Sequence, residues 1–182
     1  MPPQGRLLVH APNIHQGGGR TLLIALLESL ASSQEPSGSI QVTLDSRLEI
    51  EKGLTGKLKL SRVAPSMGAR LCAEWNLARN SKQGDVLLCF GNLPPIFPIQ
   101  ARVVLFLQNY YLVGRVSVTA LPIRLKTRLL LERLWLRSTV HRCQKVIVQS
   151  RTMQELVRNE LGIEAIVAPF VGTTTQRAQP SK

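Results

Sequence analysis

The chain has 182 residues, 44% of them apolar, which suits one compact domain with a hydrophobic core. It carries 23 Lys and Arg against 11 Asp and Glu, and the net charge of +12 favours an anionic partner such as a phosphate, a nucleic acid or an acidic membrane surface. The first residues lack a secretory signal pattern, and no stretch reaches the ~20 uncharged apolar residues of a transmembrane helix. The wide spacing of Cys72, Cys89 and Cys143 excludes a disulfide framework or a metal-ligand pattern, so we expect reduced thiols in a cytoplasmic protein.

The first half of the chain alternates between strand and helix patterns. A short apolar run predicts a buried strand over residues 6–10, and a Leu-rich stretch after three glycines predicts a helix over 21–30. A Pro-, Gly- and Ser-rich loop over 32–39 leads to strands over 40–45 and 58–64. In the helix predicted over 66–79, Met67, Leu71 and Trp75 recur with Ala78 at helical spacing, which indicates a buried face, and Glu74 is expected on the solvated side.

The second half continues the alternation. Near-continuous apolar runs predict strands covered on both faces over 85–91 and 102–109, joined by the rigid loop NLPPIFP. A helix over 119–143, a strand over 145–150, a helix over 151–161 and a strand over 164–170 follow. Strands separated by helices predict an α/β fold, a doubly wound and mainly parallel Rossmann-like sheet with helices on both faces. We expect this domain to span residues 1–171 and the polar tail 172–182 to be disordered.

The three consecutive glycines occupy the first strand-to-helix turn, the favoured place for a phosphate in such sheets. Without side chains, Gly17, Gly18 and Gly19 let backbone N–H groups and the positive helix end approach an anion, and Arg20 or His15 would add charge. A tight turn that only lets the helix pack against the sheet explains the glycines too.

Two well-known phosphate motifs do not fit this turn. A Walker loop would need a glycine where Ile14 stands and a lysine where Arg20 stands. A dinucleotide fingerprint that starts at Gly17 would need a glycine in place of Leu22. The sequence therefore disfavours a nucleotide triphosphatase and a nicotinamide or flavin enzyme.

Three segments carry a family resemblance: HAPNIHQGGG, the strand VVLFLQN followed by two tyrosines, and KVIVQSRTMQELVRNELGI. Together they resemble the N-terminal half of GT-B glycosyltransferases, particularly the retaining family four type, over residues 6–170. The resemblance implies a Rossmann-like domain that holds the sugar acceptor, with a separate C-terminal domain that binds the nucleotide-sugar, often through an E-x7-E element. No two glutamates here are eight positions apart, so we expect the donor half to be absent from this sequence, which would then be a fragment, the product of a truncated gene, or one part of a split enzyme with a separate donor-binding domain or subunit. The nucleotide-sugar would be a co-substrate, and no resident cofactor is expected.

The resemblance also implies roles for several residues. The three glycines would line the cleft near the donor phosphates or the acceptor, and Gln108 and Asn109 stand where family members often place an acceptor-contacting or basic residue. Both are amides, which can orient a hydroxyl but cannot serve as a general base. Ser150 is either a helix N-cap or an acceptor contact, and His15 either bonds a phosphate or acceptor or is a solvated loop residue. His10 is expected to be structural.

Other catalytic chemistry lacks a signature. The sequence has no G-x-S-x-G and no H-E-x-x-H, and its carboxylates are few and scattered. Asp85 begins a strand, at the edge opposite the expected site, and Asp45 ends a strand but stands alone. We therefore assign no catalytic residue and no metal site.

The segment LPIRLKTRLLLERLWLR, residues 121–137, mixes basic and apolar side chains. A basic apolar helix can lie on an anionic membrane surface, peripheral to the inner face of the membrane, and a core helix with snorkelling arginines is the alternative. The expected membrane-facing residues are Arg124, Lys126, Arg128, Arg133, Trp135 and Arg137.

The resulting functional hypothesis is the acceptor-side domain of a glycosyltransferase that transfers a sugar from a nucleotide-sugar to a glycan or lipid-linked acceptor. A non-catalytic interaction or regulatory domain of the same shape is the alternative. Nucleic-acid binding is less expected, because only 4% of residues are aromatic and no RNA- or DNA-binding motif is present.

Overall fold

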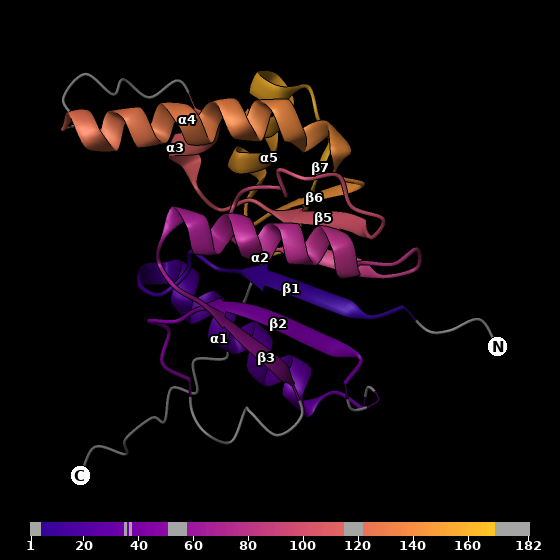
Figure 1. Ribbon diagram of the computed structural model, residues 1–182. Helices are drawn as coiled ribbons and strands as arrows, with labels where there is room; N and C mark the ends of the chain where they lie inside the picture. The colour runs from indigo at the N-terminus through magenta and orange to yellow at the C-terminus, as the bar shows by residue number, and fades with distance from the viewer. Residues whose placement is uncertain (1–4, 35, 37, 51–57, 115–121, 170–182) are drawn as a thin grey trace, which may run out of the picture.

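The computed structural model describes residues 5–34, 36, 38–50, 58–114 and 122–169, which form one α/β unit (Figure 1). Its centre is a parallel sheet with strand order β3-β2-β1-β4-β5-β6-β7. The strands are β1 Leu7–Ala11, β2 Ile40–Asp45, β3 Lys59–Val63, β4 Val86–Cys89, β5 Arg102–Phe106, β6 Lys145–Val148 and β7 Ala165–Val167. The helices are α1 Gly17–Ser32, α2 Met67–Asn80, α3 Tyr110–Val113, α4 Ile123–Thr139 and α5 Arg151–Leu161, and a 3₁₀ turn over Val140–Arg142 follows α4.

The sheet separates two hydrophobic clusters, because successive side chains of a strand point to opposite faces. On β1, Val9 belongs to the cluster that includes Leu23 and Leu27 of α1. Leu8 belongs to the other cluster, to which α3, α4 and α5 contribute. Helices therefore cover both faces, and the predicted doubly wound Rossmann-like fold is confirmed.

Local signals fix several helix ends. The Ser150 hydroxyl accepts a hydrogen bond from the Met153 N–H at 3.2 Å, which confirms its predicted capping role for α5, and Ser66 caps α2 in the same way. Gly162 ends α5 with φ of +68°, the left-handed conformation that favours glycine.

Several strands are shorter than predicted, β5 ending at Phe106 and not at residue 109, and two further differences lie near the site. The glycine triplet forms the first turn of α1 and does not lie in the loop before it, with Gly17 at φ of +68° where the helix begins. The short helix α3, capped by Asn109, was not predicted, because four residues are too few for a periodic pattern. Residues 119–121 of the helix predicted over 119–143 and the predicted disordered tail over 172–182 lie outside the described residues.

Candidate functional site

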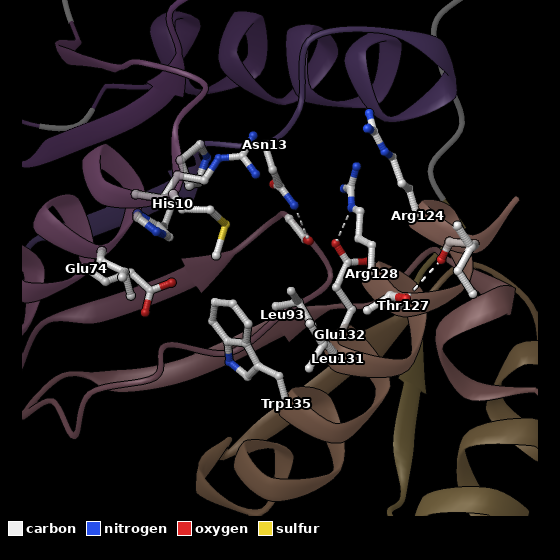
Figure 2. A pocket seen from close by; sticks show the side chains of 16 residues that line it. His10, Asn13, Glu74, Leu93, Arg124, Thr127, Arg128, Leu131, Glu132 and Trp135 are labelled. Carbon is white, nitrogen blue, oxygen red and sulfur yellow. Dashed lines mark hydrogen bonds and ion pairs between the residues drawn. The ribbon is translucent and has the colours of Figure 1, made fainter.

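A pocket of about 720 Å³ opens at the carboxyl ends of β1 and β4, between α2 and α4 (Figure 2). The chain leaves β1 toward β2 on one side and returns from α2 into β4 on the other, so this is the switch point of the sheet. Ligands of doubly wound proteins bind at such points, where connections diverge and leave a crevice. The pocket is lined by His10, Pro12, Asn13, Met67, Arg70, Leu71, Glu74, Gly91, Leu93, Ile123, Arg124, Thr127, Arg128, Leu131, Glu132 and Trp135.

The apolar face of α2 forms one wall of this pocket. Met67 and Leu71 line it and are 71% and 40% exposed, while Trp75 is 51% exposed and contacts Phe97 edge-on. The prediction that these residues form a buried core face is therefore wrong. Their helical spacing is real, but the stripe faces the pocket and the surface.

Glu74 is also placed differently from the prediction. The side chain was expected in solvent, but Glu74 is only 7% exposed and lines the pocket. One carboxylate oxygen accepts a hydrogen bond from the Ile96 N–H at 2.8 Å. Burial raises the pKa of Glu74, and the hydrogen bond from Ile96 offsets this only in part. A buried carboxyl group thus stands at the pocket wall, as Figure 2 shows.

The opposite wall comes from α4, which supplies an aromatic ring and two cations. The indole N–H of Trp135 donates to the Pro94 carbonyl at 2.9 Å, so the ring is held in a fixed orientation. Arg124 is exposed at the mouth of the pocket, and Arg128 forms an ion pair with Glu132 at 2.8 Å. Leu131 adds apolar surface on this side.

The floor of the pocket is polar, and several of its buried atoms have no partner among the described residues. His10 is 5% exposed, and neither of its ring nitrogens makes a hydrogen bond within the described part of the chain. The Asn13 amide nitrogen donates to the Gly91 carbonyl at 2.9 Å, whereas its Oδ1 has no partner in the described ranges. The same holds for Nε of Arg70. Burial lowers the pKa of His10 to about 4, so the imidazole is neutral at physiological pH.

Asp45, at the end of β2, contacts Arg70 of the pocket floor. The prediction that Asp45 stands alone is therefore wrong. Its carboxylate, fully buried, accepts hydrogen bonds from Nε and Nη2 of Arg47 at 2.9 and 2.7 Å. Arg70 lies 3.7 Å and the His15 ring nitrogen 4.0 Å from the same carboxylate. The hydrogen bond from Arg47 lowers the pKa of Asp45 to about 2, against the effect of burial. Arg70 therefore shares the single negative charge of Asp45 with Arg47.

The residues predicted around the glycine turn gather beside this pocket but do not line it. A side chain at Gly19 would contact Ile14 and the Gln108 Oε1, so α1 starts against the end of β5. A side chain at Gly17 or Gly18 would meet no described atom within 4 Å, and Arg20 is exposed. The open space at Gly18 means that packing alone does not require a glycine there.

Gln108 and Asn109 are held by an interaction that sequence reasoning missed. The side-chain oxygen of Asn92 accepts hydrogen bonds from the backbone N–H groups of Gln108 at 2.6 Å and Asn109 at 2.9 Å. Asn92 itself has φ of +70°, a conformation that asparagine tolerates better than most residues. Asn109 uses its side chain to cap α3 by accepting from the Tyr111 N–H at 3.0 Å.

The predicted membrane-facing residues divide between the surface and the interior. Arg124, Arg128 and Arg137 are exposed, and Lys126 is half-buried. Arg133 donates to the carbonyls of Tyr111 and Gly114, both at 2.9 Å, and thereby ties α4 to α3.

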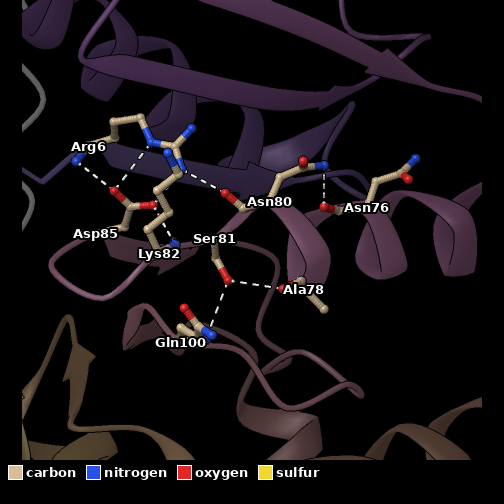
Figure 3. Close-up of polar contacts among 8 residues, drawn as sticks. All are labelled: Arg6, Asn76, Ala78, Asn80, Ser81, Lys82, Asp85 and Gln100. Atoms are coloured by element: carbon tan, nitrogen blue, oxygen red, sulfur yellow. Dashed lines mark hydrogen bonds and ion pairs between the residues drawn. The ribbon is translucent and has the colours of Figure 1, made fainter.

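A second polar cluster surrounds Asp85 just before β4, at the end of the strands opposite the pocket (Figure 3). Asp85 accepts hydrogen bonds from the backbone N–H groups of Arg6 and Lys82, both at 2.9 Å, and from the Arg6 guanidinium. Burial acts to raise the pKa of Asp85, but these bonds outweigh it and lower the pKa to about 2. Both carboxylate oxygens of Asp85 are partnered, whereas the pocket floor at the other end of the strands has buried donors and acceptors without a partner among the described residues.

The described ranges hold no metal-binding cluster, and two of the three cysteines have raised thiol pKa values. No group of three or more His, Cys, Asp or Glu side chains there could hold a metal ion. Burial raises the pKa of Cys89 well above its ordinary value and that of Cys143 to about 12, so both thiols stay protonated. None of the described helices is long and apolar enough to cross a membrane.

Comparisons with protein-family models, with curated proteins and with solved structures each found no match. Sequence reasoning missed the pocket residues His10, Asn13 and Arg70. Asn13 follows β1, so the switch-point rule applied to the residues after each strand would have found it, whereas His10 lies within β1 and was expected to be structural. Arg70 lies on a helix distant in sequence, and no local pattern marks it.

Proposed function

We propose that this chain is the acceptor-side domain of a GT-B-like glycosyltransferase, which receives a sugar from a nucleotide-sugar bound by another domain or subunit. The observation that carries the proposal is the pocket at the switch point, with a polar floor, apolar walls and a cationic mouth. The resemblance of HAPNIHQGGG supports it, because the residues of this segment run from the pocket floor at His10 and Asn13 to the start of α1 at Gly17.

The residues that line the pocket favour an amphipathic acceptor. We therefore propose a lipid-linked saccharide and not a free glycan. Met67, Leu71 and Leu131 provide apolar walls that would hold a lipid chain, while Arg124 at the mouth would hold a phosphate. The neighbouring start of α1 would leave room for donor phosphates beside Gly18. Because Gln108 is an amide, the proposal includes no enzymic general base at this position.

A lipid-linked acceptor requires access to a membrane, and α4 offers a surface for it. Leu130 and Leu134 are 46% and 66% exposed without lining the pocket, and Arg137 lies one turn beyond Leu134. Exposed apolar side chains next to arginines, on a chain of net charge +12, suit peripheral binding to an anionic bilayer. We expect the full chain to co-sediment with phosphatidylglycerol vesicles and not with phosphatidylcholine vesicles.

Vesicle binding has a matched control. The double variant Leu130→Ser and Leu134→Ser should weaken co-sedimentation, whereas Ile166→Ser, which changes an equally exposed side chain on β7, should not. High salt should release the protein, since surface electrostatics are screened. Equal binding to both vesicle types, or loss in the Ile166 variant alone, would contradict the membrane part of the proposal.

The central experiment measures binding of lipid-linked saccharides and of a nucleotide-sugar panel to the purified chain, together with sugar transfer. We expect a lipid-linked saccharide to bind, and Gly18→Val to leave this binding and the fold intact because a side chain at Gly18 meets no described atom. If the chain turns over a nucleotide-sugar, Gly18→Val should abolish turnover. Absence of binding for every saccharide in the panel would sink the proposal and leave a non-saccharide partner for the pocket.

A further inference from the structure

The floor of the pocket displays an unusual set of buried hydrogen-bonding atoms. His10 offers one donor and one acceptor, because its neutral ring carries a single N–H. Asn13 offers an acceptor through Oδ1, and Arg70 offers a donor through Nε. Leaving such atoms buried without partners is costly, so a fold that keeps several of them together is arranged for a ligand that supplies the partners.

The balance of these atoms selects the chemistry of the ligand. A phosphate or carboxylate only accepts hydrogen bonds, and it would leave the His10 acceptor and the Asn13 oxygen unmatched. An ammonium group only donates, and it would leave the Arg70 N–H unmatched. A hydroxyl group both donates and accepts, and adjacent hydroxyls on a ring satisfy donors and acceptors alike.

Charge supports the same choice. Arg70 lies 3.7 Å from the buried Asp45 carboxylate, which Arg47 also holds, so the charge of Arg70 is balanced only in part; the buried Glu74 carboxyl group on the pocket wall opposes an anion near the floor. Among the described residues that line the pocket, Arg124 is an exposed cation at the mouth and is placed to meet an anion. The floor and the mouth therefore favour different parts of one ligand.

Trp135 completes the site from α4. Its hydrogen bond to Pro94 fixes the indole, and the ring lines the pocket opposite His10 (Figure 2). An aromatic face packs well against the polarised C–H groups on one side of a sugar ring. We infer that His10, Asn13 and Arg70 bind the hydroxyls of a neutral pyranose ring that packs against Trp135, which makes the floor a sugar-recognition site.

The inference rests on the proposed function, since it names the part of the acceptor that enters the pocket. It assigns His10 a role in ligand binding, in contrast to the structural role expected from its place in a strand. It also explains Gly91, because any side chain there would overlap the Asn13 side chain. A glycine at this position leaves Asn13 free to face the pocket.

The test uses saturation-transfer NMR with the full chain and a panel of methyl pyranosides, which detects weak binding of single sugar rings. At least one pyranoside should receive saturation from the wild-type protein, and His10→Leu and Asn13→Ala should each weaken its binding about tenfold. His10→Gln, which keeps a donor and an acceptor, should restore part of the binding. Arg79→Met, a change at an exposed arginine of the same helix as Arg70, serves as the control and should bind normally.

Three outcomes would overturn the inference, and they differ from a failure of the proposed function. If inorganic phosphate displaces the pyranosides, and does so to the same extent in His10→Leu as in the wild type, the site recognises anions. If lipid-linked saccharides bind the wild type and His10→Leu equally, the acceptor is bound but His10 does not read the sugar. If neither pyranosides nor lipid-linked saccharides bind, the inference and the proposed function both fail.

Discussion

The buried His10 makes a direct prediction about stability as a function of pH. Burial lowers the pKa of His10 from 6.5 to about 4, so the unfolded chain binds more protons than the folded protein between these values. Stability contributed by the neutral ring is fully present above pH 6.5 and is lost as the pH falls toward 4. A pKa shift of this size corresponds to a loss of about 3 kcal/mol in the free energy of unfolding between pH 6.5 and pH 4.

Replacement of His10 by leucine isolates this contribution. Leucine has a similar volume and no polar atoms that need a partner. At neutral pH the free energy of unfolding of His10→Leu should therefore exceed that of the wild type by on the order of 1 kcal/mol. The difference should then grow in favour of His10→Leu as the pH falls toward 4. Urea unfolding of both proteins at several pH values without ligand measures this difference. Parallel pH profiles, or a large loss of stability at neutral pH, would refute the reasoning and indicate a partnered, structural histidine.

The other buried groups of the site make further predictions. Glu74→Gln should raise the free energy of unfolding at neutral pH, because burial raises the pKa of Glu74 and so disfavours its charged form in the folded protein. Urea unfolding at several pH values should show this gain shrinking as the pH falls and Glu74 of the wild type becomes protonated. Asp45→Asn should lower stability by about 2 kcal/mol at neutral pH, since the lowered pKa of Asp45 stabilises the fold above the unfolded value of 3.8, and the difference should vanish as the pH approaches 2 in the same assay. Gly91→Ala should displace the Asn13 side chain and weaken pyranoside binding in NMR about tenfold, as Asn13→Ala does, while costing no more than about 1 kcal/mol in urea unfolding; unchanged binding would show that Asn13 is not needed.

The sheet was predictable because its strands are near-continuous apolar runs. Strands such as Val86–Cys89 and Arg102–Phe106 are covered on both faces, so their order with the intervening helices already indicates a parallel doubly wound sheet. The boundary at the glycine triplet was less predictable, because glycine disfavours helices and yet Gly17–Ser32 begins with three of them.

The site was harder to predict than the fold, and α2 shows why. A helical apolar stripe indicates one face of a helix, but periodicity does not say whether that face meets a core or a pocket, so Met67 and Leu71 were assigned to the interior. The burial of Glu74 depends on the loop that carries Ile96, which approaches from a distant part of the chain. The cluster around Asp45 likewise joins residues from β2, α2 and two loops, and only the fold brings them together.

The central claim is that the switch-point pocket binds a saccharide acceptor. Backbone amide chemical shifts of the isotope-labelled chain, recorded during titration with a lipid-linked saccharide, test it most directly. We expect the largest changes at His10, Asn13 and Gly91 and along the walls formed by α2 and α4. Changes confined to other parts of the sheet, or an unchanged spectrum at every concentration, would contradict the claim.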